Sequence, residues 1–374
     1  MNFGKENVFK NGERFRGYIV ERLLGNGSLG AVYLVRNELL GTVSAMKVLF
    51  PGVVQEDPDY VKRFIREAKI ATRIRHPNLV AVHDCGLDEE RGLYYLVMDY
   101  VSGGDLRQAL AFAGRFSPER AAEVVLQIAS ALDAAQEYRV VHRDIKPENI
   151  MIQPDGLVKL VDLGIAKADD LKDSLHTQAD SVFGTPAYIA PEQAVDAASV
   201  DVRADIYSLG VVLFEMISGK VPFDGPNAPQ ILVQTLSSDP FPDIRDIVPD
   251  VKPGLAVLIR RMCVKECNRR IPTPKALIEE FDKLGYRLKD RGDAAVKYAP
   301  ASDSAPTVKN IRELVDSGPA KAVKTLSFET QDVEIKDFVH ALKRKKRNRR
   351  LLRWIGAVAA AVAVTFVLLI CLET

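Results

Sequence analysis

The chain has 374 residues, a length that suggests two to three structural units. Of these residues 47% are hydrophobic and 27% charged, so the chain can bury a sizeable core. The net charge is +1, but eight basic and no acidic residues lie within 343–353, which leaves about −7 for the rest. The body of the chain therefore lacks the charge of a nucleic-acid-binding protein, and we expect no nucleic-acid partner.

The N-terminal part of the sequence is typical of strands with one helix. Its first residues, MNFGKENVFKNGERF, are polar and contain no apolar run, so we expect no cleaved signal peptide. Residues 15–50 contain three runs rich in β-branched and aromatic residues, broken by glycines, and VAVHDCGL and LYYLVMDY resemble two more strands. Between them, Asp57 and Pro58 suit the start of a helix. Its apolar face would be formed by Val61, Phe64, Ile65 and Ala68.

After Tyr100 the pattern becomes helical. Ser117 and Pro118 suit the start of a helix that continues to about Tyr138. Further helical patterns cover about 201–218, 228–237, 254–263 and 273–284. We therefore expect a strand-rich lobe of about 85 residues followed by a helix-rich lobe of about 185, with the border near Asp99 to Gly104.

The four cysteines, Cys85, Cys263, Cys267 and Cys371, have no disulfide-framework spacing, which fits a reducing compartment. Cys263 and Cys267 could form half of a metal site. Since no second Cys or His pair lies nearby in sequence, we favour small side chains in a helical region.

The stretch LLGNGSLGAVYLV contains Gly25, Gly27 and Gly30 at G-x-G-x-x-G spacing. Such glycines recur by chance in roughly one chain in ten, and a plain glycine-rich turn would show them too. A dinucleotide-binding fold needs a helix next, but AVYLVRN is a strand pattern. Strand, glycine loop and strand instead predict a hairpin whose N–H groups can bind nucleotide phosphates.

Lys47 lies inside the apolar strand pattern VSAMKVLF. It either faces solvent or points inward, where it needs a partner. Glu67 comes three residues after Phe64, near the buried face of the predicted helix. A Lys47–Glu67 pair would hold the lysine where it can neutralise α- and β-phosphate charge.

The most specific stretch is VVHRDIKPENIMI, because its five fixed residues H-R-D-x-K-x-x-N are expected by chance in about one chain in ten thousand. Asp144 can accept the proton of a hydroxyl group or orient that hydroxyl for in-line attack, and Lys146 can steady the transferred phosphoryl group. Asn149 offers an oxygen ligand to Mg²⁺. Asp162, at the end of the strand pattern in VKLVDLGIAK, offers a carboxylate to the same ion.

These motifs resemble those of a Hanks-type protein kinase of the bacterial serine/threonine branch. The resemblance covers about residues 14–285 and includes GNGSLGAV, AMK, Glu67, HRDIKPEN, DLG, GTPAYIAPEQ and DIYSLG. It implies an α+β, two-lobe protein kinase fold over 14–286. A β-rich N-lobe at about 14–98 and a hinge at 99–101 would precede an α-rich C-lobe at 102–286.

The resemblance also implies roles for individual residues. Asp144 would be the catalytic base, Lys47 and Glu67 the lobe-bridging ion pair, and Lys146 with Thr185 the mark of Ser/Thr specificity. Mg²⁺, with Mn²⁺ as an alternative, would bind to Asn149 and Asp162. The residues expected to contact ATP are Leu24, Gly25, Asn26, Gly27, Ser28, Leu29, Gly30, Ala31, Val32, Lys47, Asp99 and Val101.

Other implied features concern support and control. Met98 would lie behind the hinge, Glu192 would pair with Arg270, and Asp205 would brace the catalytic loop. Leu163 stands where the family most often has Phe. This departure leaves open how far the inactive state is populated relative to the active state. Arg143 before Asp144 implies control by phosphorylation of the activation segment, Asp162 to Glu192. The candidate acceptors are Ser174, Thr177 and Ser181.

The C-terminal part of the chain predicts a membrane anchor. Residues 287–342 are a mostly flexible linker, in which Ile335, Phe338, Val339 and Leu342 could form a short amphipathic helix. Residues 354–372 are uncharged and, as a helix, about 28 Å long, which matches a bilayer core of ~30 Å better than a buried soluble helix.

The basic run 343–353 fits the cytoplasmic side of such a span better than a nucleic-acid patch or a localisation signal. Gly356 and Ala360 give a weak dimerisation signal. Only Glu373 and Thr374 follow the span, so we expect no external sensor.

Taken together, the sequence predicts a Ser/Thr protein kinase, held at the cell membrane with its kinase domain in the cytoplasm. Its expected partners are protein substrates, the chain itself through autophosphorylation or a dimer, and membrane lipid. A pseudokinase scaffold is the competing class, although Lys47, Asp144, Asn149 and Asp162 are all present. A small-molecule kinase is disfavoured by GTPAYIAPEQ, which in the family shapes a protein-substrate groove.

Overall fold

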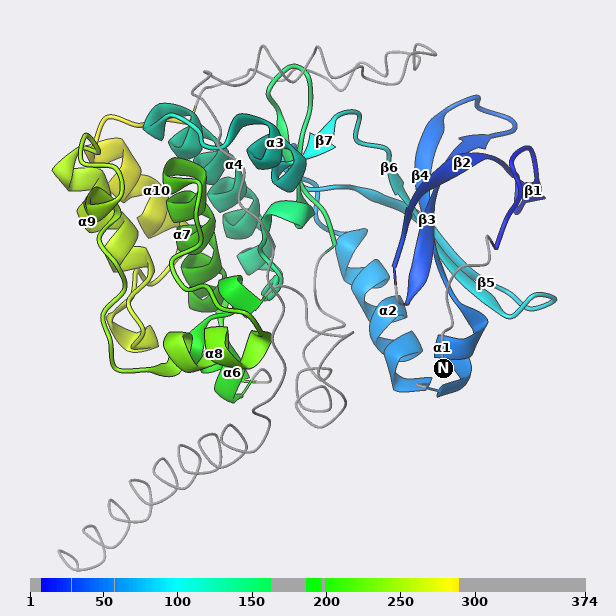
Figure 1. Cartoon of the computed structure of the whole chain (residues 1–374). Coiled ribbons are helices and arrows are strands. Elements are labelled where there is room, and N and C mark those ends of the chain that lie inside the picture. Colours follow the sequence, from blue (N-terminus) through cyan, green and yellow to red (C-terminus); the bar gives the residue numbers. More distant parts are fainter. Residues whose placement is uncertain (1–7, 28, 57, 163–185, 197–198, 289–374) are drawn as a thin grey trace, which may run out of the picture. The chain divides into compact units, whose positions relative to one another are not determined.

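A computed structural model of the chain describes residues 8–27, 29–56, 58–162, 186–196 and 199–288. All of them belong to the first of two compact units, Met1–Val323. Within this unit a strand-rich lobe precedes a helix-rich lobe, as the sequence pattern predicted (Figure 1).

The first lobe is built on an antiparallel sheet of six strands in the order β1-β2-β3-β4-β6-β5. The strands are β1 (Arg14–Phe15), β2 (Tyr18–Asn26), β3 (Gly30–Asn37), β4 (Val43–Leu49), β5 (Val82–Asp88) and β6 (Leu93–Asp99). The strand that carries Lys47 lies between β3 and β6, so its backbone is held on both sides.

Two helices, α1 (Pro51–Glu56) and α2 (Pro58–Ala71), follow β4. Three apolar residues of α2, Tyr60, Phe64 and Ala68, are buried in one cluster with Leu49 and Leu96 of the sheet. This packing confirms the helix and apolar face predicted from the spacing after Asp57. Burial of each large apolar side chain stabilises the lobe by about 2 kcal/mol.

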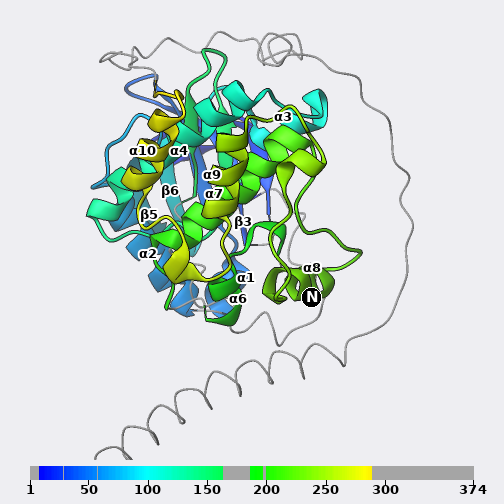
Figure 2. The same cartoon turned by 90° about the vertical axis from the view of Figure 1, so that its left-hand side faces the viewer.

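The second lobe is mainly helical. Its helices are α3 (Leu106–Ala113), α4 (Pro118–Glu137), α6 (Pro191–Val195), α7 (Val202–Ser218), α8 (Ala228–Leu236), α9 (Pro253–Met262) and α10 (Pro274–Lys283). Nearly every residue of α7 is buried. It contacts α4 and α9, while α10 lies against the other side of α4 (Figure 2). The buried centre of this lobe thus forms around α4 and α7.

A small three-stranded sheet carries the segments that lead to the candidate site. It has the order β7-β8-β9 and contains β7 (Gly104–Asp105), β8 (Ile150–Ile152) and β9 (Val158–Leu160). A 3₁₀ turn, η1 (Pro147–Asn149), precedes β8, and a second one, η3 (Pro186–Tyr188), precedes α6. The two ends of the β8–β9 hairpin therefore bring 144–149 and 161–162 to one place.

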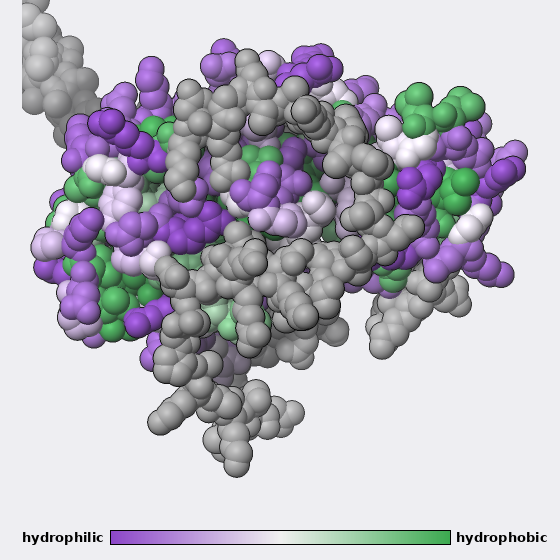
Figure 3. All heavy atoms as spheres, turned by 90° about the horizontal axis from the view of Figure 1, so that it is seen from above, coloured by the Kyte–Doolittle hydropathy of each residue, from purple (hydrophilic) through white to green (hydrophobic). Residues whose placement is uncertain are grey.

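On one face of the molecule, hydrophilic and hydrophobic residues of the described part are intermingled (Figure 3). None of the helices formed by the described residues is long and apolar enough to cross a membrane. The predicted basic run 343–353 and span 354–372 lie outside the described residues, as does all but the start of the predicted linker.

Candidate active site

The glycine stretch forms the hairpin that its sequence context predicted. Gly25 pairs with Val32 in the β2–β3 ladder, and the N–H of Gly27 donates to the carbonyl of Gly30 at 2.9 Å. At Gly30 a side chain is excluded, because a Cβ there would lie 2.0 Å from the carbonyl oxygen of Val48. Ser28 lies outside the described residues, and Leu24 and Val32 are half-buried.

Lys47 reaches from the sheet to the other lobe. Its Nζ lies 2.8 Å from Oδ1 of Asp162, and its side chain is 24% exposed. The lysine is therefore not simply a solvated strand residue. Glu67 lies in α2, but its side chain is outside the described part of the chain, so the Lys47–Glu67 pair stays a prediction.

The loop around Asp144 is closed by contacts between three of its own residues. The Nδ2 of Asn149 donates to the backbone oxygen of Asp144 at 2.8 Å and to its Oδ2 at 2.7 Å. The Nζ of Lys146 lies 3.1 Å from the same Oδ2. The Asp144 carboxylate is thus held in place before any substrate binds. It faces the ammonium group of Lys146, which could also approach a transferred phosphoryl group.

Asp205 braces this loop from α7, as the resemblance implied. Its carboxylate accepts backbone N–H bonds from His142 at 2.8 Å and from Arg143 at 2.7 Å. Burial raises the pKa of Asp205 to about 7, although these two donors act in the opposite direction. The loop before Asp144 is therefore tied to the most buried helix of the lobe.

Backbone strain lies next to the candidate groups. Arg143 has a φ of 64° and Asp162 a φ of 54°. Non-glycine residues rarely adopt this left-handed conformation, which costs of order 1 kcal/mol each. Arg143 is held there by bonds from two other segments, because its N–H donates to Asp205 and its carbonyl oxygen accepts a hydrogen bond from Gln193 at 2.8 Å.

The sequence interpretation gave no role to two of the residues that hold this loop. The Nε2 of His142 lies 3.1 Å from the carbonyl oxygen of Val161, just before Asp162. His142 therefore links the loop of Asp144 to the segment of Asp162. His142 belongs to the H-R-D motif and Gln193 is the last residue of GTPAYIAPEQ, so these motifs could have indicated both residues.

The segment between the lobes is also well defined. Met98 and Val101 are buried, and the N–H of Asp99 donates to the carbonyl oxygen of Ala81 at 2.9 Å. The side chain of Asp99 contacts His83 and Lys159. Its carboxylate therefore lies among polar groups of two other segments, while its backbone continues the chain towards Val101.

The donors near Asp144 fit a magnesium ion that is bound together with nucleotide. The Asn149 amide makes both of its bonds to Asp144 through its nitrogen, so its oxygen is the atom suited to a cation. Asp162 supplies a carboxylate that is 43% exposed on its side chain. Among the described residues no group of three or more His, Cys, Asp or Glu could hold a metal alone. Mg²⁺ needs only one or two protein ligands when phosphates and waters supply the others.

A protein-family model described as the protein kinase domain matches residues 18–281. The chain belongs to the protein kinase family. A curated relative, serine/threonine-protein kinase PknB of Mycolicibacterium smegmatis, is 33% identical over 358 residues, covering 95% of this chain and 54% of that protein. PrkC of Bacillus subtilis, also described as a serine/threonine-protein kinase, is 36% identical over 324 residues, covering 86% and 49%.

A solved structure agrees with this family membership. The crystal structure of the Mycobacterium tuberculosis PknI kinase domain has a TM-score of 0.59 and 29% sequence identity, covering 74% of this chain and 99% of that one. These relatives confirm the two-lobe kinase fold and the bacterial serine/threonine branch that the motifs predicted. The chain spans about half the length of the curated relatives that it matches.

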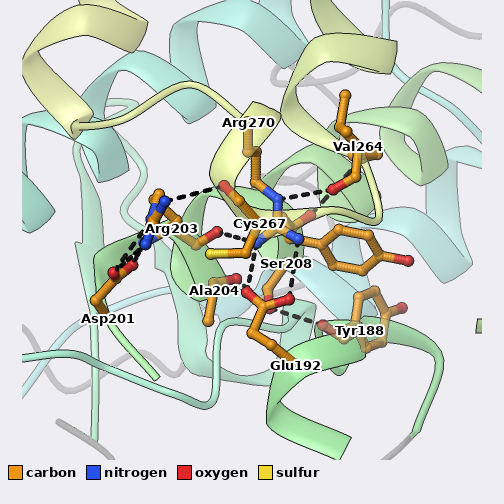
Figure 4. A network of polar contacts seen from close by, with 11 residues as sticks. Tyr188, Glu192, Asp201, Arg203, Ala204, Ser208, Val264, Cys267 and Arg270 are labelled. Atoms are coloured by element: carbon orange, nitrogen blue, oxygen red, sulfur yellow. Dashed lines mark hydrogen bonds and ion pairs between the residues drawn. The ribbon is translucent and has the colours of Figure 1, made fainter. Parts of the chain in front are cut away.

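A buried ion pair stabilises the C-lobe of this kinase domain, as the resemblance implied. Arg270 donates to both carboxylate oxygens of Glu192, at 2.6 and 3.0 Å, and to the backbone oxygens of Arg203 and Val264 (Figure 4). Its side chain is fully buried and its guanidinium lies over the Tyr207 ring. Cys267 takes part through its carbonyl, which accepts a bond from Arg203.

A second network, which the sequence interpretation missed, centres on Arg107 in the first turn of α3. Its guanidinium contacts Glu148 at 2.9 Å, Glu215 at 2.6 Å and the hydroxyl of Tyr188. Tyr188 in turn donates to Glu215. Arg107 therefore joins the loop that follows Asp144 to α7 and to the C-terminal end of the activation segment, where Tyr188 lies. Residues 163–185, including Leu163, Thr185, Ser174, Thr177 and Ser181, lie outside the described residues.

Proposed function

We propose that the chain transfers the γ-phosphate of ATP to serine and threonine hydroxyls of proteins. The observation that supports this most is the approach of Lys47 to Asp162 at 2.8 Å, beside a loop in which Asn149 and Lys146 hold Asp144. A strand lysine, a carboxylate suited to a metal ion and a candidate base thus share one site. Phosphoryl transfer depends mainly on such positioning and charge neutralisation.

Each residue has a proposed role in this reaction. Asp144 orients the acceptor hydroxyl and takes its proton, while Lys146 neutralises charge on the transferred group. Asn149 and Asp162 would hold Mg²⁺, which neutralises phosphate charge when it is bound. Lys47 would contact the α- and β-phosphates, with Glu67 as its proposed second partner.

The nucleotide itself would be bound between the glycine hairpin and the hinge. The ladder between Gly25 and Val32 shapes the loop that would cover the phosphates, and at Gly30 the backbone lies too close to the carbonyl oxygen of Val48 for a side chain to fit. Backbone N–H groups in such a loop are suited to phosphate oxygens. The backbone from Asp99 to Val101 would receive the adenine.

The enzyme is tested with the full-length chain, radiolabelled ATP, Mg²⁺ and a generic basic protein as acceptor. Transfer by the wild type and its loss by several orders of magnitude in Asp144→Ala support the proposal. Asp250→Ala removes an exposed carboxylate of the same lobe and serves as the matched control. Equal transfer by wild type and Asp144→Ala contradicts a kinase mechanism. Nucleotide binding without any transfer in the wild type supports the scaffold class instead.

We also propose that this kinase modifies its own activation segment. Arg143 lies directly before Asp144, where it could pair with a phosphate on Ser174, Thr177 or Ser181. Intact mass and peptide mapping of the protein after incubation with ATP test this. A fully active enzyme with an unmodified segment would show that such control is absent.

The third part of the proposal is location. The uncharged run 354–372 would anchor the chain in the cell membrane, after a linker at 287–342 and the basic run 343–353. The basic run supports a cytoplasmic kinase domain, because positively charged residues stay on that side of a span. Self-association would use the small residues Gly356 and Ala360, which lie one helical turn apart in the proposed span.

A further inference from the structure

Three strands meet in a polar cluster at the hinge. The carboxylate of Asp99, at the end of β6, lies 2.7 Å from Nε2 of His83 in β5 and 3.0 Å from Nζ of Lys159 in β9. The backbone N–H of Ala81 also donates to this carboxylate, at 3.3 Å. One carboxylate therefore receives groups from both lobes, and we refer to His83, Asp99 and Lys159 as the hinge cluster.

Lys159 also reaches a further part of the N-lobe. Its Nζ donates to the carbonyl oxygen of Leu79 at 3.4 Å, in the segment that leads from α2 to β5. The backbone of β9 is bound to the same segment, because Val80 donates to the carbonyl of Leu160 and Leu160 donates to that of Asn78. A single ammonium group therefore contacts this segment and the hinge at once.

These contacts lie at the junction of the proposed active-site segments. The α2 helix carries Glu67, the hinge begins at Asp99, and Asp162 follows Lys159 by three residues. The side chain of Lys159 is 12% exposed and that of Asp99 22%. Partial exclusion of water strengthens such a pair relative to a surface ion pair. Burial would raise the pKa of Asp99, but His83 and Lys159 lower it to about 2.

We propose that Lys159 and His83 are positioning residues for adenine-nucleotide binding, which act by fixing the Asp99 carboxylate and with it the backbone from Asp99 to Val101. This inference rests on the proposed function, because that backbone is the proposed adenine site. Neither residue touches the nucleotide in this scheme. Their loss should weaken nucleotide binding and leave the phosphoryl-transfer step in place.

The experiment uses the full-length chain and the variants Lys159→Met, His83→Ala and Lys159→Arg. Steady-state transfer gives KM for ATP and kcat, and calorimetry gives the Kd of ADP with Mg²⁺. We expect Lys159→Met and His83→Ala to raise KM and Kd together by about three- to tenfold, with kcat within about twofold of the wild type. Lys159→Arg keeps the charge and should restore most of the affinity.

Arg36→Met is the matched control, because it breaks a half-exposed pair with Glu21 at 2.6 Å in the same sheet. It should leave KM and Kd unchanged. The inference is overturned if the hinge-cluster variants lower the melting temperature but keep wild-type KM and Kd, or if kcat changes while KM does not. Failure of the proposed function is a separate result, since it would appear as a wild type that binds ADP but transfers no phosphate.

Discussion

Lys47 and Asp162 are 115 residues apart in sequence, yet Nζ of the lysine lies 2.8 Å from Oδ1 of the aspartate. One belongs to the central part of the N-lobe sheet, and the other follows the last strand of the β8–β9 hairpin. The contact places a cation beside a carboxylate that is suited to a metal ion. A substitution that removes this contact should therefore affect the chemistry more than the fold.

Replacement of Lys47 by Met should lower turnover by several orders of magnitude, because it removes the lysine that lies 2.8 Å from Asp162 and that would neutralise phosphate charge. The free energy of unfolding should change by no more than about 1 kcal/mol, since the side chain is partly exposed. Transfer from radiolabelled ATP and urea unfolding measure the two effects. A Lys47→Met variant with wild-type turnover would refute the role given to this residue.

Gly30→Ala should destabilise the glycine hairpin and weaken ATP binding. The added Cβ would lie 2.0 Å from the carbonyl oxygen of Val48, so the strands must separate at a cost of about 1–3 kcal/mol. The control is Gly25→Ala, since no described heavy atom outside its immediate neighbours lies within 4 Å of a Cβ there. Thermal unfolding should separate the two variants, and equal melting temperatures would contradict this account of Gly30. The KM for ATP is compared between Gly30→Ala and the wild type, because Gly25 is itself an expected ATP contact.

Arg270→Met should lower the free energy of unfolding by about 3 kcal/mol, because it leaves the Glu192 carboxylate without its bidentate partner in a buried site. Arg287→Met removes a comparable charge from an exposed pair with Asp282 and should cost less than about 0.5 kcal/mol. Urea unfolding of both variants makes the comparison. If both variants lower the free energy of unfolding by less than about 0.5 kcal/mol, the Glu192–Arg270 pair does not stabilise the C-lobe.

The stability contributed by Asp99 should depend on pH. Its pKa in the folded protein is about 2, below the usual 3.8, so the contribution is present above about pH 4 and is lost as the pH falls through about 2. Near neutral pH it should amount to about 1–2 kcal/mol, allowing for the solvent that still reaches the group. The difference in unfolding free energy between wild type and Asp99→Asn should therefore shrink by about half between pH 5 and pH 3. A constant difference over this range would mean that His83 and Lys159 do not stabilise the ionised carboxylate.

Helices with a local start signal could be predicted from the sequence to within one or two residues. Ser117 accepts a bond from the N–H of Arg120, and Thr273 accepts one from that of Ala276, directly before α4 and α10. These caps depend only on neighbours along the chain. The short helix α3 was not predicted, although Asp105 caps it, because eight residues give little periodicity.

Long-range contacts such as that between Glu192 and Arg270 were predicted where the family resemblance implied both partners. Nothing in the local sequence of Asp99 indicates Lys159, which is 60 residues away. The same holds for Arg107, whose partner Glu215 is 108 residues away. Such pairs depend on how β9, α3 and α7 pack, so they could be found only in three dimensions.

The last prediction concerns the proposed anchor. Deletion of 351–374 should release a soluble kinase with near-normal activity on an added substrate, because the family match ends at residue 281. Transfer to native targets in the cell should fall, since anchoring raises the local concentration of enzyme near membrane-bound substrates. Membrane fractionation and transfer assays measure the two effects.

A substitution control separates anchoring from loss of chain. Val364→Arg with Leu368→Arg places two charges in the middle of the proposed span, at a cost of about 3 kcal/mol each in a bilayer, whereas Val364→Leu with Leu368→Ile keeps it apolar. Only the arginine variant should leave the membrane fraction. The basic run should meanwhile hold the kinase domain on the cytoplasmic side, at about 1 kcal/mol per nearby Lys or Arg. Extraction of the wild type by carbonate or high salt, or digestion of its kinase domain by protease added to the outer face, would rule out a cytoplasmic kinase with a membrane-spanning anchor.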